Sequence, residues 1–179
     1  MSPFFDKKIR GMAEFKDIFI KVENRRRFSE QQIASNDIAV CRFLDLQTFS
    51  QWIMQTNILE YIYIENPHSE LIKRSLELIY LRAIYKENPL QDSVIEAIWK
   101  SATEKYEDII RASLTIIEEM VPYLSIEKLA KFYSFISMLP DSLYDEMRVD
   151  FLEKYTLGAL SVLFKHRTNM RSTTQVRQQ

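Results

Sequence analysis

Apolar residues recur at helical spacing along most of the chain. In five successive segments the intervals follow the 3.6-residue period of an α-helix. These segments cover residues 69–86, 92–103, 107–121, 125–137 and 141–165. In the first of them apolar side chains occupy most of the circumference, so we expect that helix to be buried between neighbours.

The two C-terminal segments carry defined apolar stripes, which we expect to face the core. For segment 125–137 the predicted stripe is Ile126, Leu129, Ala130, Tyr133 and Ile136. For segment 141–165 it is Leu143, Met147, Phe151, Leu152, Tyr155, Ala159, Leu160 and Leu163. Upstream the pattern is weaker, but it still predicts helices near residues 12–22, 28–35 and 46–59.

Proline, and not glycine, separates these segments. The 179 residues include only two glycines, Gly11 and Gly158, so no glycine-rich phosphate-binding loop is present. Two-residue hairpin turns also depend on glycine, asparagine or aspartate, which argues against a hairpin-rich fold. Prolines, which can begin or end a helix but not continue one, stand near the breaks in the pattern. They are Pro67, Pro89, Pro122 and Pro140.

Successive antiparallel helices joined by short loops fit two architectures, a bundle and an α-solenoid. Helices begin near residues 46, 69, 92, 107, 125 and 141, so pairs of helices repeat about every 33–46 residues, a range that overlaps the armadillo and HEAT period of about 40–47. No residue-level repeat accompanies this spacing. Spacing alone therefore favours the solenoid and leaves the bundle open.

Composition indicates a globular chain from a reducing compartment. Apolar residues make up 46 % and charged residues 27 %, and Cys41 is the only cysteine. A single cysteine cannot form an internal disulfide. No stretch of 18 uninterrupted apolar residues is present, so we expect no membrane span. We expect a cytoplasmic protein, with the nucleus as the alternative.

The net charge of −1 conceals basic ends around an acidic body. Residues 6–27 hold eight Lys and Arg against four acids, and residues 165–179 hold four bases and no acid. Residues 28–164 hold 12 bases and 21 acids, which poorly suits a nucleic-acid groove. The basic ends nevertheless support an alternative function, a stand-alone helical adaptor that binds nucleic acid or an anionic membrane.

Arg25, Arg26 and Arg27 form the densest basic cluster. One interpretation is recognition of a phosphate, an acidic peptide or a nuclear-import factor. The other is a helix C-terminus, where cations complement the helix dipole. We keep these three residues as candidate protein-binding residues.

A second candidate is the uninterrupted apolar run from Tyr61 to Ile64. Four consecutive apolar residues exceed what one helical turn buries against a single neighbour. They either pack beneath an adjacent helix or form an exposed protein-binding patch. From this run Tyr61, Tyr63 and Ile64 are candidate protein-binding residues.

No residue set has the pattern of a catalytic, cofactor or metal site. Cys41 lies in an apolar run, where a free cysteine usually acts as a small hydrophobe. His68 and His166 are about a hundred residues apart and lack a clustered set of metal ligands. We expect His68 to cap or pack at a helix start and His166 to lie near a helix end. The acidic pairs 118–119 and 145–146 are adjacent on helices and therefore do not face each other.

The order of several residues resembles a known family. A Trp-Ile helix leads to a short apolar strip, and an Asn-Pro-His turn then begins a helix with the sequence Glu-Leu-Ile-Lys-Arg-Ser. Together with later anchors, these features resemble the non-catalytic helical region of the large fat-facets-type ubiquitin-specific proteases over residues 44–163. The matching positions are Trp52-Ile53-Met54, Ile58 to Tyr63, Glu65 to Ser75, Leu90, Ile95, Ile98-Trp99, Lys105, Pro122-Tyr123-Leu124, Leu129, Ile136-Ser137, Leu139-Pro140, Phe151-Leu152 and Ala159-Leu160.

The resemblance implies an all-α armadillo/HEAT-like superhelix of about seven to eight antiparallel helices. It divides the chain into a helical extension (1–43), an armadillo-like region (44–165) and a flexible basic tail (166–179). It also implies a non-catalytic scaffold that mediates protein–protein interaction or positions substrates in the ubiquitin pathway. The proteases themselves are thiol-dependent ubiquitinyl hydrolases, but this chain has neither their Cys box nor their His box. We therefore expect no enzyme activity, no cofactor and no small-molecule substrate; the expected partners are proteins.

Overall fold

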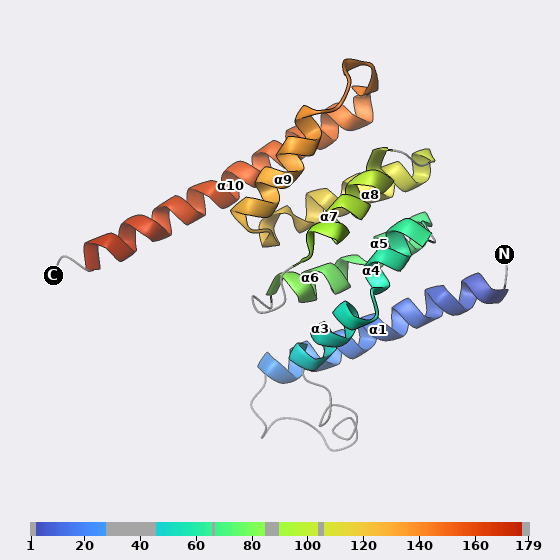
Figure 1. Cartoon of the computed structure of the whole chain (residues 1–179). Helices are drawn as coiled ribbons and strands as arrows, with labels where there is room; N and C mark the ends of the chain where they lie inside the picture. The colour runs from blue at the N-terminus through green and yellow to red at the C-terminus, as the bar shows by residue number, and fades with distance from the viewer. Residues whose placement is uncertain (1–2, 28–45, 66, 85–89, 104–105, 177–179) are drawn as a thin grey trace. The chain divides into compact units, whose positions relative to one another are not determined.

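The computed structural model describes residues 3–27, 46–65, 67–84, 90–103 and 106–176 (Figure 1). Across these ranges the backbone is helical or forms short turns, and no strand occurs in them. No helix within the described ranges combines the length and apolarity needed to cross a membrane. The elements are α1 (Pro3–Arg27), α3 (Leu46–Gln55), α4 (Ile58–Glu60), the π-helix η2 (Tyr61–Glu65), α5 (Ser69–Lys73), α6 (Leu76–Ile84), α7 (Asp92–Thr103), α8 (Glu107–Met120), the 3₁₀-helix η3 (Val121–Tyr123), α9 (Ile126–Ser137), the 3₁₀-helix η4 (Asp141–Leu143) and α10 (Glu146–Val176).

The chain forms two compact units, Met1–Ala97 and Ile98–Gln179. This division differs from the one expected from the sequence. The expected boundary at residue 43 lies outside the described residues. The boundary at residue 165 falls inside α10, which continues to Val176, so the predicted flexible tail is helical over most of its length.

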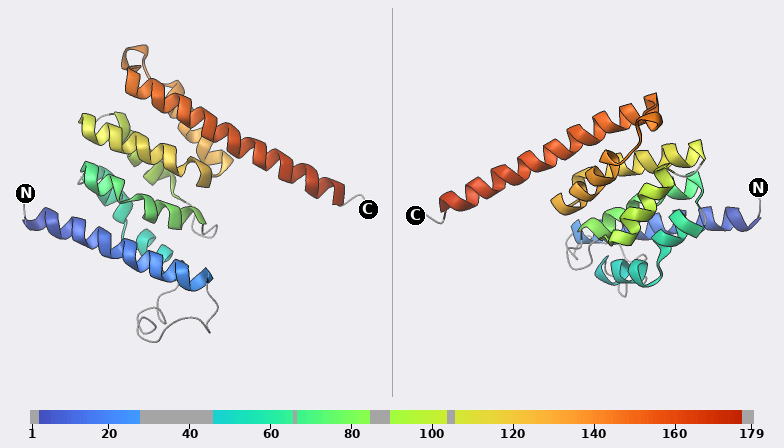
Figure 2. Two further views of the ribbon diagram at one scale, coloured as in Figure 1. Left: turned by 180° about the vertical axis from the view of Figure 1, so that it is seen from behind. Right: turned by 45° about the horizontal axis from the view of Figure 1, so that its top comes forward.

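In the first unit α1 packs along α3 and α5, and α3 packs on α6 (Figure 2). The rings of Phe15 on α1 and Trp52 on α3 lie 5.2 Å apart. Lys16 Nζ on α1 forms an ion pair of 2.7 Å with Glu77 Oε1 on α6. The first helix is therefore an integral part of this unit. The core includes Ile53, Leu59, Ile62, Leu71, Ile72, Leu78 and Ile79.

Two of the predicted helices are interrupted in this unit. The segment expected at 46–59 ends at Gln55, and Asn57 adopts a left-handed conformation (φ 49°) before α4. Asparagine is one of the few residues that tolerates this region of the backbone map. The segment expected at 69–86 is split at Arg74 and Ser75 into α5 and α6. The Ser75 hydroxyl donates 2.7 Å to the Ile72 carbonyl, which satisfies an acceptor at the end of α5.

In the second unit α10 packs on α8, η3 and α9, and three aromatic rings join α7 to α9. Trp99 stacks on Phe135 with centroids 5.9 Å apart, and Phe132 meets Trp99 edge-on at 6.5 Å. Phe132 is fully buried. The amphipathic helix α8 supplies a further buried face with Ile109, Ile110, Leu114, Ile116, Ile117 and Met120.

The buried stripe of α9 differs from the one predicted. Leu129, Phe132 and Ile136 are buried, whereas Ala130 and Tyr133 are exposed and Ile126 is 37 % exposed. The sequence pattern allowed either face, because apolar residues occupy both. The pairing of Phe132 with Trp99 decides which face is buried, and it is a contact between segments far apart in the sequence.

Two contacts hold α10 against its neighbours. The Tyr155 hydroxyl donates 2.7 Å to the Leu129 carbonyl of α9. At Gly158 the helix approaches η3 so closely that a Cβ would lie 2.9 Å from Val121 Cγ1. The glycine that interrupts the apolar run of the sequence thus allows close helix packing.

We expect Gly158→Ala to destabilise the second unit by about 1 kcal/mol, although alanine is the better helix former by a similar amount. The stiff, buried Val121 has little room to move away from the added methyl group. Urea unfolding of the purified chain measures this loss. The double variant Gly158→Ala with Val121→Ala should unfold at a higher urea concentration than the summed effects of the two single substitutions predict. Strictly additive effects would contradict the contact.

We expect the second unit to lose stability above pH 10. Burial raises the pKa of Tyr155 to about 12, against an ordinary value of about 10. The folded state therefore favours the neutral phenol; this stabilisation is complete below pH 10 and is lost as the pH rises towards 12. Urea unfolding at several alkaline pH values measures how the free energy of unfolding falls as the pH rises. This fall should be shallower for Tyr155→Phe than for the wild type. Tyr106→Phe, which changes an exposed ring, should decline in parallel with the wild type; equal slopes for all three proteins would contradict the assignment.

Candidate protein-binding surface

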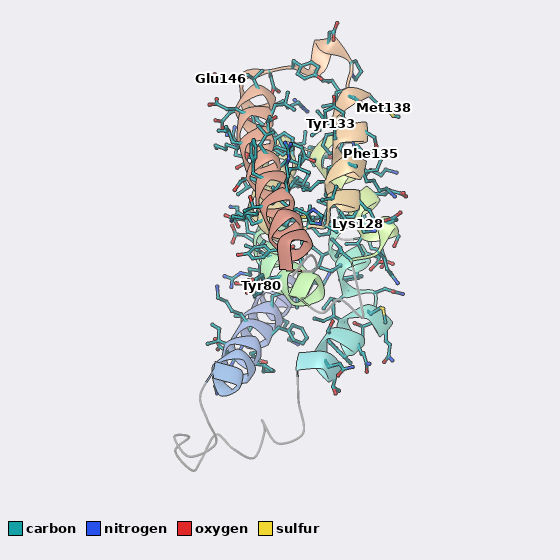
Figure 3. All side chains as sticks on the ribbon, turned by 90° about the vertical axis from the view of Figure 1, so that its left-hand side faces the viewer. Tyr80, Lys128, Tyr133, Phe135, Met138 and Glu146 are labelled. Carbon is teal, nitrogen blue, oxygen red and sulfur yellow. The ribbon has the colours of Figure 1, made fainter. Side chains whose placement is uncertain are left out.

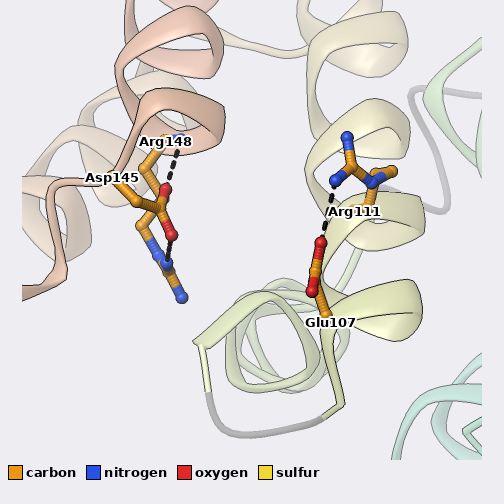
Figure 4. A network of polar contacts seen from close by, with 4 residues as sticks. All are labelled: Glu107, Arg111, Asp145 and Arg148. Carbon is orange, nitrogen blue, oxygen red and sulfur yellow. Dashed lines mark hydrogen bonds and ion pairs between the residues drawn. The ribbon is translucent and has the colours of Figure 1, made fainter.

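The N-terminus of α10 is fixed by Asp145 and Arg148 (Figure 4). Asp145 Oδ1 accepts 2.8 Å from the Arg148 backbone N–H, which is a helix N-cap. Asp145 Oδ2 accepts from Arg148 Nη1, so one carboxylate serves both groups. The Arg148 side chain is buried, and its Nε has no hydrogen-bond partner among the described residues. The start of α10 thus depends on one partly exposed carboxylate.

A charge network lies where α10 faces α8. Lys154 Nζ lies 2.7 Å from Asp150 Oδ2 and 3.7 Å from Glu118 Oε2. Burial raises the pKa of the Glu118 carboxyl above its ordinary value, while the charge of Lys154 opposes that rise. The hydrogen bond to Asp150 raises the pKa of Lys154. These groups are accounted for by the packing of α10 on α8.

Opposite the packed face, α10 exposes an apolar stripe. Phe151 and Tyr155 point into the core, but four large apolar residues in the following turns are exposed. They are Leu157 (61 %), Leu160 (44 %), Leu163 (42 %) and Phe164 (64 %). We call these four residues the outer stripe of α10. Their spacing places them on adjoining positions of one helix face.

The length of α10 adds further exposed surface towards its C-terminus. It has 31 residues, against 14 in α8 and 12 in α9. At 1.5 Å per residue, α10 is about 46 Å long and its neighbours about 20 Å. Its C-terminal half therefore extends past the helices that it packs on, as Figure 2 shows. Side chains are described only as far as residue 168.

Charged residues flank the outer stripe at both ends. Glu153 lies one turn before Leu157, and Arg167 lies one turn after Phe164. Both are exposed, and neither forms an ion pair within the part of the chain that the structure describes. The outer stripe is thus an apolar centre with an acidic residue on its N-terminal side and a basic residue on its C-terminal side.

A smaller exposed set lies on α9. Tyr133 is 65 % exposed and Met138, just after the helix, is 77 % exposed. Figure 3 labels both residues, with Glu146 at the first position of α10. They are separated along the helix by more than one turn, so they make a less continuous surface than the outer stripe.

The structure separates the three candidates of the Tyr61 to Ile64 run. Tyr63 is buried, and its hydroxyl lies 2.7 Å from Ser75 Oγ. Because Ser75 donates its own proton to the Ile72 carbonyl, the Tyr63 hydroxyl is the donor, and burial raises its pKa. Tyr61 is partly buried with Lys8 Nζ 5.2 Å from its ring centroid, and Ile64 is exposed. Tyr63 therefore packs in the core, which is the first of the two alternatives for this run.

The other candidates have mixed outcomes. Arg25, Arg26 and Arg27 end α1, but their side chains lie outside the described residues, as does Cys41.

His68 is the N-cap of α5, since its Nδ1 accepts from the Glu70 N–H, which confirms the capping interpretation. His166 does not lie near a helix end, because α10 continues to Val176. The described residues contain no group of three or more metal-ligating side chains.

The sequence pattern did not predict that the outer stripe is exposed. Leu160 and Leu163 were expected to face the core, because they continue the run that begins at Phe151. A signal was nevertheless present: Leu157, Leu160 and Phe164 keep intervals of three and four residues on the face opposite Tyr155. A helix with two apolar faces needs packing on both, and the described residues cover only one face of α10.

The sequence matches the UBP24/USP9X/USP9Y ARM repeat family over residues 1–153. No curated protein matches the chain, and no solved structure does either. The match begins at the first residue, so the N-terminal helix falls within the family region and not before it. The helical elements described above fit the armadillo-like all-α architecture that this family implies. Because the match covers most of its length, the chain belongs to the UBP24/USP9X/USP9Y ARM repeat family.

Proposed function

We propose that this chain is a non-catalytic helical scaffold that binds protein through the outer stripe of α10. The observation that carries the proposal is the exposure of Leu157, Leu160, Leu163 and Phe164 on one face. A continuous apolar patch with charged flanks is typical of a protein interaction site. Family membership supports the scaffold role, since ARM repeats generally present helix faces to other proteins.

The shape of the outer stripe favours a helical partner. A straight helix with apolar residues at intervals of three and four is complementary to another amphipathic helix. Leucine and phenylalanine side chains each contribute about 1.5–3 kcal/mol when removed from water. Four such side chains contribute at most about 6–12 kcal/mol, from which an association cost of about 4–15 kcal/mol is subtracted.

The proposal assigns no catalytic step to this chain. A thiol protease requires a cysteine activated by a histidine, and the sequence offers Cys41 with only two histidines, far apart. The single cysteine also supports a reducing compartment, so the proposal places the scaffold in the cytoplasm, where it serves ubiquitin-pathway proteins.

Photo-crosslinking tests the binding role. A photoreactive amino acid at position 160, introduced in cells, should capture a protein identified by mass spectrometry. The same probe at Thr115, an exposed position of α8, is the matched control. Leu157→Asp in the same chain should reduce the adduct from position 160 without changing the control. An equal yield at positions 160 and 115 would contradict the proposal.

The non-catalytic role has a separate test. The purified chain should release no fluorophore from a ubiquitin–fluorophore conjugate. Hydrolysis that is lost on Cys41→Ser would overturn this part of the proposal.

A further inference from the structure

We propose that the outer stripe of α10 binds a second copy of this chain, with the two α10 helices antiparallel and the two-fold axis at Leu160. This inference rests on the proposed function, because it names the partner of the same surface. It follows from the spacing, the charges and the exposure of residues 153–167.

The spacing is that of a two-helix seam. Glu153, Leu157, Leu160, Phe164 and Arg167 follow one another at intervals of four, three, four and three residues. These intervals keep the five side chains along one line of the helix surface, where a second helix can pack. The three central positions are apolar and the two outer positions are charged, and all five side chains are exposed.

The charges select the antiparallel orientation. Glu153 and Arg167 each lie seven residues from Leu160, on opposite sides. A two-fold axis at Leu160 therefore places Glu153 of each copy opposite Arg167 of the other, which gives two such pairs. A parallel pair would place like charges opposite each other, which is unfavourable. Both residues are free to make these pairs, since neither has an ion-pair partner in the described chain.

The apolar positions follow this symmetry in part. Leu157 of one copy faces Leu163 of the other, and Leu160 meets its own counterpart, whereas Phe164 faces Thr156 at the edge of the contact. The seam from Glu153 to Arg167 is about 21 Å long at 1.5 Å per residue. Such a contact is small, so we expect a dimer that dissociates in roughly the micromolar range.

Charge reversal tests the inference in the full purified chain. By sedimentation equilibrium, the wild type should show concentration-dependent dimerisation. Glu153→Arg or Arg167→Glu alone replaces two attractive pairs with two repulsive ones, and each should weaken dimerisation about tenfold. The double variant Glu153→Arg with Arg167→Glu restores both pairs with exchanged signs. It should return the dissociation constant to within about threefold of the wild type.

A disulfide test locates the axis independently. In a Cys41→Ser background, Leu160→Cys places two thiols across the two-fold axis, so oxidation should form a covalent dimer. Ser161→Cys, exposed on the same helix but outside the seam, is the control and should cross-link far more slowly.

The outcomes separate this inference from the proposed function. A wild type that stays monomeric at all concentrations, a double variant that is not restored, or equal cross-linking at positions 160 and 161 would overturn the second-copy inference. A monomeric chain whose position-160 probe still captures another protein would overturn this inference and leave the protein-binding proposal standing. If the probe at position 160 forms no adduct with a second copy or with another protein, both the second-copy inference and the protein-binding proposal are overturned.

Discussion

Phe132→Ala is expected to lower the free energy of unfolding of the second unit by about 3–5 kcal/mol. Phe132 is fully buried, and its ring meets both Trp99 and Phe135 edge-on. Truncation removes apolar surface from the core and leaves a cavity between α7 and α9. It also removes the ring that decides which face of α9 is buried.

Trp99 fluorescence during urea unfolding measures this loss. The chain has two tryptophans, and Trp52→Phe leaves Trp99 as the only reporter, which lies in the second unit. Tyr133→Ala is the matched control, because Tyr133 is the next residue but is exposed. It should change stability by less than about 1 kcal/mol. Similar losses for Phe132→Ala and Tyr133→Ala would contradict the observed register of α9.

Asp145→Ala is expected to destabilise the second unit by about 2–4 kcal/mol. Two effects combine in this substitution. The first turn of α10 loses its N-cap, and the buried Arg148 guanidinium loses its only ion-pair partner within the described residues. A buried charge without a partner is far more costly than a buried pair.

Substitutions at Arg148 separate the two effects. Arg148→Met keeps the cap and removes the buried charge, so it should remain within about 1 kcal/mol of the wild type. Asp145→Ala with Arg148→Met should lose only the cap, about 1 kcal/mol. The same fluorescence measurement applies. If the double variant is as unstable as Asp145→Ala alone, the buried charge is not the cause.

The sequence was sufficient to predict most helices, because apolar period and proline positions depend on local chemistry. The segments at 92–103, 107–121 and 125–137 agree closely with α7, α8 and α9. His68 as a cap was also predictable, since its place after Pro67 marks a helix start. Features that depend on local chemistry alone can therefore be predicted from a single sequence.

Features that depend on contacts between distant segments were not predictable. The break at Arg74 and Ser75 relies on the Ser75 hydroxyl, which also serves the buried Tyr63. Burial on α9 is decided by Trp99, some 30 residues away in the sequence. The exposure of Leu160 depends on which face of α10 packs on α8, η3 and α9. Periodicity shows which face of a helix is apolar, but it does not show which other element packs on that face.

A photo-crosslinking scan along α10 tests most directly the claim that its outer stripe binds protein. The probe is placed in turn at residues 156–164, and the adduct yield is measured at each position. Maxima at 157, 160, 163 and 164, with minima at 158 and 162, would agree with docking on the outer stripe. Yields that do not vary with position, or maxima on the face of Tyr155 and Gly158, would contradict it.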